Sequence, residues 1–200
     1  MQSFISDPHD LHDSHDRLAA RRTYLLLRTS LLDLLCREPY EKISLTELCA
    51  AAMIPRSTFY RYFEDKDDLQ RYCLQAMLED AHFNEDVLCF KNADSIRDFL
   101  LTLIRILDAD LPRYRDIYQI NKDGMLMKII RDYLIQILAG MLKHAKSSGC
   151  RFKIEIPIFS ALLADFYFST LRCYMELSDQ YDIDTFVDNV CLFSEKDFFL

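Results

Sequence analysis

Apolar side chains recur every three to four residues along most of the chain, and this spacing limits what the chain can fold into. The first such segment runs from about Asp16 to Arg37 and carries a predicted leucine stripe. The stripe consists of Leu18, Leu25, Leu27, Leu31, Leu34 and Leu35. Only three glycines and five prolines occur in 200 residues, so few positions interrupt a helix. We therefore expect an all-α protein.

Residue signals at helix ends divide the rest of the chain into further helices. Ser44 and Glu47 have the spacing of a capping box, in which each side chain satisfies the backbone amide of the other residue. Pro55 suits the first position of a short helix, and Asp65 suits the cap of the next one. The remaining predicted helices are 56–63, 66–83, 95–110, 112–120, 124–146, 155–177 and 184–193.

These signals suggest three regions. Residues 1–16 form a polar arm, residues 17–64 a small helix-turn-helix domain, and residues 65–200 a larger helical bundle. The arm places His9, His12 and His15 three residues apart, a spacing that would align the imidazoles on one helical face for a transition metal. The alternative is a flexible, solvated leader, because so short a polar segment gains little from ordering.

The sequence contains no motif typical of catalysis. It has no Gly-rich phosphate loop, no HExxH and no nucleophile elbow, and the adjacent Asp67 and Asp68 suit a helix start. Its seven cysteines form no CxxC pair and are expected to be reduced and mostly buried. We expect no enzyme, no cofactor and no metal centre beyond the hypothesis for the arm.

Neither a membrane span nor a signal peptide is predicted. No run of 18 uncharged apolar residues occurs, and the first ten residues lack the basic-then-apolar order of a signal peptide. We expect a cytoplasmic protein with no membrane partner.

Charge is distributed unevenly along the chain. The net charge is −8, yet residues 17–63 hold eight Lys/Arg against four Asp/Glu, so this segment is near +4 and the remainder near −12. A positive region on an acidic protein indicates localised contact with DNA rather than general adhesion to nucleic acid.

The segment 44–63 has the layout of a helix-turn-helix: a helix, a short turn and a short second helix. Phe59 and Phe63 lie one turn apart and are predicted to pack inward against Leu48 and the first helix. The polar side chains of 56–62 then face outward on a helix narrow enough for a major groove.

At these residues the sequence resembles the TetR family of transcriptional regulators. The resemblance lies in "ISLTELCAAAMIPRSTFYRYFEDKDDL", residues 43–69, and in the amphipathic helix before it, and it covers the N-terminal third. It implies that Arg56, Ser57, Thr58, Arg61 and Tyr62 meet bases and backbone in the recognition helix. It also implies that Tyr60, Lys66 and Thr46 hold phosphates, which suits a hydroxyl or an ammonium near helix N-termini.

Two residues depart from the family pattern. Met53 stands where the turn commonly has glycine, so we expect a strained turn, at a cost of about 1 kcal/mol, or a different turn geometry. Pro55 replaces the usual polar cap and removes one hydroxyl that could contact phosphate.

The resemblance further implies a C-terminal domain that dimerises and encloses a small effector. Residues 156–175 are apolar nearly all round, which suits a helix covered by its own core on one side and by a twofold partner on the other. A purely intrachain core helix is the alternative. The interface candidates are Phe159, Leu163, Phe166, Thr170, Phe186 and Val190, and the pocket candidates are Arg105, Tyr118, Met125, Asp165 and Tyr167.

Three hypotheses follow for function. The first is a homodimeric repressor that binds a palindromic operator in double-stranded DNA and is released by a small molecule. The second keeps DNA binding but controls the bundle through a protein coactivator or corepressor. The third is a helical ligand-binding protein without an operator.

Overall fold

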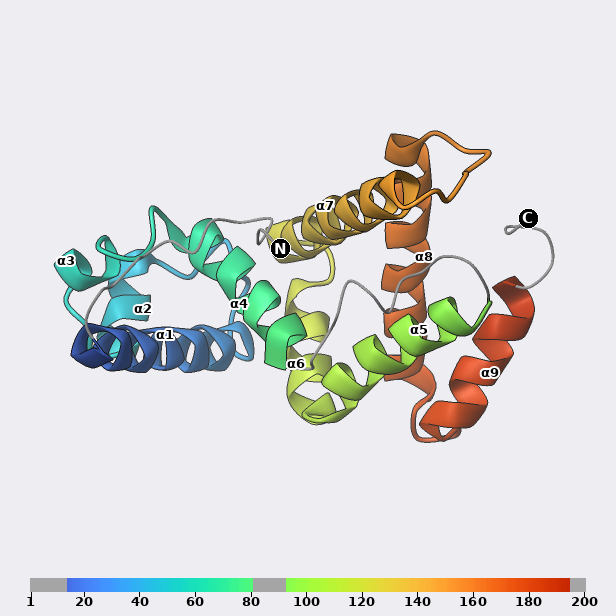
Figure 1. Ribbon diagram of the computed structural model, residues 1–200. Coiled ribbons are helices and arrows are strands. Elements are labelled where there is room, and N and C mark those ends of the chain that lie inside the picture. Colours follow the sequence, from blue (N-terminus) through green and yellow to red (C-terminus); the bar gives the residue numbers. More distant parts are fainter. Residues whose placement is uncertain (1–13, 81–92, 195–200) are drawn as a thin grey trace. The chain divides into compact units, whose positions relative to one another are not determined.

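The computed structural model describes residues 14–80 and 93–194 (Figure 1). In these ranges the regular structure is entirely α-helical, which confirms the all-α prediction. The helices are α1 Ser14–Leu35, α2 Leu45–Ala51, α3 Arg56–Phe59, α4 Lys66–Asp80, α5 Ala93–Asp108, α6 Leu111–Asn121, α7 Met125–Ser147, α8 Ile156–Leu177 and α9 Ile183–Ser194. His9 and His12 of the metal hypothesis lie outside the described residues.

The chain packs as two compact units. Of the described residues, 14–74 and 116–129 form the first, called here the head unit, and 75–80, 93–115 and 130–194 form the second, the bundle unit. The head unit therefore includes the start of α4 and the turn between α6 and α7. The functional division predicted at residue 64 stays a prediction.

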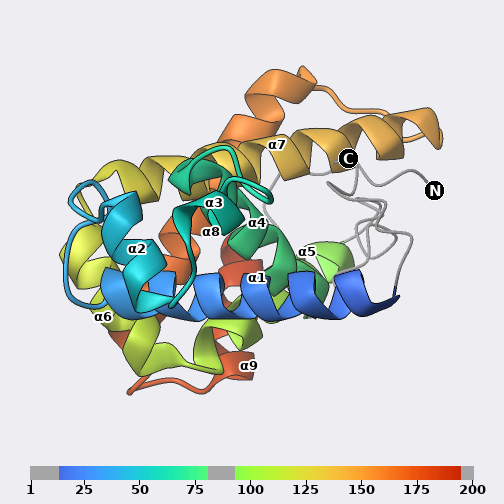
Figure 2. The same cartoon turned by 90° about the vertical axis from the view of Figure 1, so that its left-hand side faces the viewer.

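In the head unit, α1 supports the helix-turn-helix, with α2 and α3 on one side of it (Figure 2). Leu27, Leu31 and Leu35 of α1 are fully buried, together with Leu48 of α2 and Phe59 of α3. These residues bury the inner face of α1 against α2 and α3, which are too short to be stable alone.

Two leucines of the predicted α1 stripe are not part of this core. Leu18 is 63% and Leu25 is 62% exposed. A helix turns by about 100° per residue, so both lie roughly 160–180° round the axis from Leu27. The predicted single stripe is therefore wrong at these two positions.

The bundle unit has its own apolar core, built from α5, α7, α8 and α9. Leu100 and Ile104 of α5, Leu138 of α7 and Ala164 and Tyr167 of α8 are fully buried in it. Helix α8 is the one helix among the described residues that is long and apolar enough to cross a membrane, with a mean hydropathy of 1.2. One side of it packs in this core.

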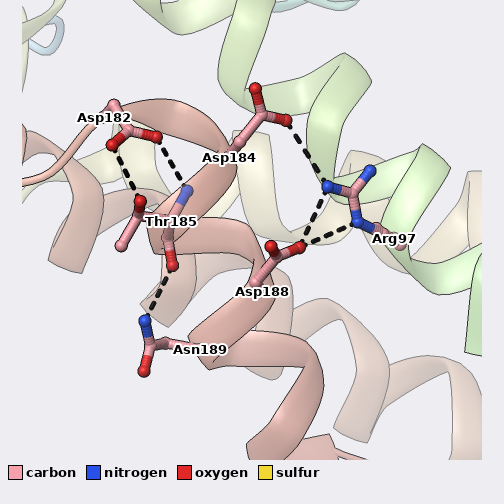
Figure 3. A network of polar contacts seen from close by, with 6 residues as sticks. All are labelled: Arg97, Asp182, Asp184, Thr185, Asp188 and Asn189. Carbon is pink, nitrogen blue, oxygen red and sulfur yellow. Dashed lines mark hydrogen bonds and ion pairs between the residues drawn. The ribbon is translucent and has the colours of Figure 1, made fainter.

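A polar network attaches α9 to α5 at the surface of the bundle unit (Figure 3). The Arg97 guanidinium lies 2.9 Å from Asp188 and 3.4 Å from Asp184. Asp182 caps α9 by accepting from the Thr185 amide at 2.8 Å, and this bond lowers the pKa of Asp182. The network fixes the start of α9 beside α5.

The described cysteines are free thiols, in agreement with the prediction that they are reduced. Cys49, Cys73 and Cys191 are buried, and burial raises the pKa of Cys73 to about 12. Cys173 departs from the expectation because it is exposed on α8. A buried thiol is a poor nucleophile, so Cys73 is a small apolar core residue.

Candidate nucleic-acid interface

Helix α2 begins at the cap predicted from the sequence. Ser44 Oγ accepts from the Glu47 amide at 3.1 Å, which satisfies one of the free amides at the start of α2. The Glu47 carboxyl bonds with Glu38, and desolvation together with this bond raises the pKa of Glu38. The cap fixes where the helix-turn-helix starts.

The turn after α2 contains the expected left-handed residue. Met53 has φ +52°, and the amide of Ile54 donates to the Cys49 carbonyl at 2.9 Å, closing the helix end. The Met53 side chain is 85% exposed, so no packing offsets the strain of a non-glycine residue here. The turn therefore keeps the left-handed geometry and is strained at Met53, rather than adopting a different geometry.

Helix α3 is shorter than the predicted 56–63 and ends at Phe59. The following residues continue in tight turns, in which the Arg61 and Tyr62 amides donate three residues back, to Thr58 and Phe59. Phe59 and Phe63 are buried with ring centroids 5.6 Å apart, as the sequence predicts. The buried pair of Phe59 and Phe63 thus holds residues 56–62 against the core of the head unit.

Three of the predicted DNA-contacting residues lie together on the surface. Arg56 donates to Tyr60 Oη at 3.2 Å and to Thr46 Oγ1 at 3.4 Å, which joins the start of α2 to α3. The hydrogen bond from Arg56 to Tyr60 raises the pKa of Arg56, whose guanidinium carries its charge in any case. The pre-ordered guanidinium has further donors for a phosphate or a guanine edge.

The other residues of α3 and its following turns differ in exposure. Ser57 and Arg61 are exposed, and Thr58 is half-buried. Tyr62 is half-buried, and its ring packs edge-on against Tyr24 of α1 with centroids 5.2 Å apart. Tyr62 therefore has less free surface for a DNA contact than Arg61 beside it.

Lys66 has an internal set of partners. Its ammonium donates to the carbonyl oxygens of Tyr40 and Ile43, the latter at 2.8 Å, and lies 4.0 Å from the Tyr40 ring centroid. Desolvation lowers the pKa of Lys66. Two of its three donors are thus used to hold the segment between α1 and α2, and one remains for another group.

A second set of contacts on that segment comes from the turn between α6 and α7. Buried Asn121 accepts from the Tyr40 amide at 2.7 Å and donates to the Leu35 carbonyl at 3.2 Å. Glu41 accepts from the Met125 amide, and this bond lowers the pKa of Glu41. Only an alignment or a tertiary structure could find this contact, because it joins residues more than 80 positions apart.

The five predicted pocket residues are divided between the two units. Tyr118 and exposed Met125 belong to the head unit, whereas the other three belong to the bundle unit. Asp165 is engaged by Arg131 at 2.5 Å, Tyr167 is fully buried against Phe99, and Arg105 is exposed. As a shared effector site they stay a prediction.

Four of the six predicted interface residues line one apolar groove. This groove has a volume of about 480 Å³ and runs between α8 and α9. It is lined by Phe166, Ser169, Thr170, Cys173, Leu177, Tyr181, Phe186, Asn189 and Val190. The other two candidates, Phe159 and Leu163, are buried in the core of the bundle unit.

Residues 31–73 match the family model for bacterial regulatory proteins of the tetR family. This segment of the chain is of the TetR type. The match spans the helix-turn-helix together with parts of α1 and α4, so it coincides with the segment that carries the Arg56 cluster. The proteins of that family are transcriptional regulators.

Known proteins agree with this assignment. A transcriptional activator of the dhaKLM operon, DhaS from Lactococcus lactis, is 28% identical over 102 residues, which are 50% of this chain and 51% of DhaS. The chain thus matches about half the length of this curated relative.

Solved structures of TetR-like regulators share the fold. A Syntrophomonas wolfei TetR-family regulator gives a TM-score of 0.61 at 16% identity, covering 87% of this chain and 93% of that one. Bacillus subtilis FadR, solved with stearoyl-CoA, gives 0.57 at 14% identity over 84% and 96%. Both share the fold of a helix-turn-helix followed by a larger helical domain.

Proposed function

We propose that this TetR-family protein is a cytoplasmic, homodimeric repressor that binds a palindromic operator through α2 and α3 and is released by a small-molecule effector. The observation that carries DNA binding is the exposed cluster of Arg56, Thr46 and Tyr60 on a rigid aromatic base. A cation held in place by two hydroxyls loses little side-chain freedom on binding, which favours specific contact.

The groove between α8 and α9 supports the homodimer. Its lining is mostly apolar, and Ile158 and Leu162 on α8 are 57% and 55% exposed beside it. An apolar surface of this kind on a regulator is typical of a protein interface. A dimer presents two α3 helices, which can enter successive major grooves about 34 Å apart.

The proposal of a small-molecule effector is supported only by similarity to other proteins. Because the FadR structure that resembles this fold contains stearoyl-CoA, an acyl-CoA is the first ligand class to test. Arg105, Asp165 and Tyr167 of the bundle unit remain candidates for such a pocket.

The second candidate function is a transcriptional activator instead of a repressor. The relative DhaS is a transcriptional activator. In that case a coactivator protein, rather than a small molecule, would act on the bundle unit. A reporter gene under the selected operator distinguishes the two, because a repressor lowers and an activator raises expression.

The test of DNA binding is selection of genomic fragments with the purified protein, followed by titration of the enriched operator. Arg56→Ala should weaken binding by about 1–3 kcal/mol if it reads a base, or reduce the salt slope by about one if it meets a phosphate. Arg37→Ala is the matched control, since Arg37 is an exposed cation of the head unit outside α2 and α3. Selection that enriches no dyad, or equal effects of both variants, would refute the proposal.

A further inference from the structure

Met53, in the turn between α2 and α3, is unfavourable in two ways in the head unit. Its side chain is 85% exposed, whereas the other exposed large apolar side chains of the described ranges are 44–63% exposed. Its backbone has φ +52°, which glycine adopts without strain and methionine does not. Neither burial nor backbone preference therefore accounts for methionine here. Strained residues of this kind are concentrated at functional sites.

The residues that follow Met53 extend the apolar surface up to the start of α3. Pro55 is exposed and directly precedes Arg56, the first residue of α3. Ile54 between them is half-buried. We call Met53 and Pro55 the apolar corner. It is joined by the chain itself to the residue that carries the proposed DNA contact.

The apolar corner lies on the side of α2 that adjoins the Arg56 cluster. Thr46, Ala50 and Met53 are spaced by four and three residues, so their Cα atoms follow one side of a helix. The spiral continues as far as Met53, because Ala52 keeps right-handed helical angles. Arg56 donates to Thr46 at 3.4 Å, which places the guanidinium beside this side of α2. Thr46 and Met53 are about 10 Å apart along it.

The rest of this surface offers little apolar contact. Ala50 and Ala51 are exposed but carry only methyl groups. The other exposed side chains of residues 45–61 are polar or charged, apart from the ring of Tyr60, whose hydroxyl is bonded to Arg56. These groups suit phosphates and the polar edges of bases. Met53 is therefore the long apolar side chain of this surface.

The major groove of DNA presents one apolar group, the C5-methyl of thymine, and apolar side chains detect it by contact. A methionine side chain has three rotatable bonds and a polarisable sulfur, so it can adjust to a methyl group whose position varies slightly. The distance of about 10 Å between Thr46 and Met53 corresponds to about three base-pair steps of about 3.4 Å. A thymine within that range of the Arg56 contact is thus within reach.

We propose that Met53, with Pro55 beside it, contacts the methyl group of one thymine in each half-site of the operator, within about three base pairs of the position that Arg56 meets. This inference rests on the proposed operator binding and adds a residue that determines sequence specificity. In the complex the exposed side chain leaves water, which offsets the strain that remains in the turn. A cytosine or a uracil at that position lacks the methyl group and is bound more weakly.

The experiment replaces the thymines of the selected operator, one symmetric pair at a time, by deoxyuridine. Deoxyuridine lacks the methyl group and keeps the hydrogen-bonding edge of thymine. For the wild-type protein, one such pair should weaken binding about fourfold per half-site, as expected for one buried methyl-sized group. The Met53→Gly variant should bind the unmodified operator more weakly by a similar factor and should bind the thymine and deoxyuridine operators equally.

Two controls accompany this measurement. Glycine removes the strain at φ +52°, so the Met53→Gly variant folds at least as well as the wild type and its loss of the methyl effect is not a loss of structure. Leu18→Ala is the matched variant, because Leu18 on α1 is another exposed apolar side chain of the head unit, 63% exposed. It should keep the wild-type response to deoxyuridine.

The outcomes separate this inference from the proposed function. If no operator is enriched, the proposed DNA binding itself is refuted. If an operator is bound but no deoxyuridine pair weakens binding, DNA binding is retained and the methyl contact is overturned. An equal deoxyuridine effect in the wild type and in Met53→Gly also overturns it, because the methyl group then acts through another residue or through the shape of the duplex. A loss of the effect in Leu18→Ala does the same.

Discussion

Replacing Asn121 with alanine should destabilise the head unit more than any other single polar change in α6. The side chain is 1% exposed and makes three hydrogen bonds: to the Tyr40 amide, to the Leu35 carbonyl and to the Ile117 carbonyl at 2.9 Å. Ile117 lies one turn earlier in α6, where the helix supplies another donor. In the Asn121→Ala variant, the backbone amide of Tyr40 and the backbone carbonyl of Leu35 both lose the Asn121 side chain as hydrogen-bond partner.

The magnitude follows from these two groups. A buried donor or acceptor left unsatisfied costs about 1–3 kcal/mol, so the two groups together should cost about 2–6 kcal/mol. The total free energy of unfolding of a domain is only about 5–15 kcal/mol. The effect should appear as a lower urea midpoint and as faster amide exchange across residues 36–44.

Thr23→Ala is the matched control. Its hydroxyl donates to the Ala19 carbonyl at 3.0 Å, a bond to the residue four positions earlier that stays within α1. The control should change stability by less than about 0.5 kcal/mol. If Asn121→Ala behaves like the control and leaves exchange of 36–44 unchanged, the assigned role of Asn121 is wrong.

Three further predictions concern the same unit. Met53→Gly should raise the unfolding free energy by about 1 kcal/mol, since glycine adopts φ +52° without strain; an unchanged urea midpoint would contradict this. Gly124→Ala places a Cβ 2.6 Å from Glu41 Oε1, so its cost in urea denaturation should largely vanish in a Glu41→Ala background; equal costs in both backgrounds would refute the contact. The pKa of Glu41 is lowered below its ordinary 4.5, so its stabilisation is present above pH 4.5 and lost as pH falls through the folded-state pKa; Glu41→Gln should flatten the stability profile in that acidic window.

For Lys66, the structure and the family resemblance indicate different roles. The resemblance implies a phosphate contact, whereas the structure uses the ammonium to hold Tyr40 and Ile43. If Lys66 mainly holds Tyr40 and Ile43, Lys66→Met should lower the free energy of unfolding by about 1.5–3 kcal/mol. If Lys66 mainly contacts a phosphate, the same variant should instead reduce the salt dependence of DNA binding, the slope of log K against log salt, by about 0.9. Both measurements on one variant decide how much each contributes.

The sequence by itself determined the local geometry of the head unit. The Ser44 cap, the left-handed Met53 and the inward Phe59 depend on bonds and contacts within a few residues, so the order of residue types is enough to predict them. The family resemblance followed from that short segment for the same reason.

Only the tertiary structure decided which side chains meet across the chain. Asn121 and Lys66 reach the segment between α1 and α2 from distant positions, and the groove between α8 and α9 exists because two amphipathic helices pack side by side. Leu18 and Leu25 have the composition of a core stripe but face away from it. Periodicity states which residues share a helix face, whereas packing determines which face is covered, and that depends on the whole chain.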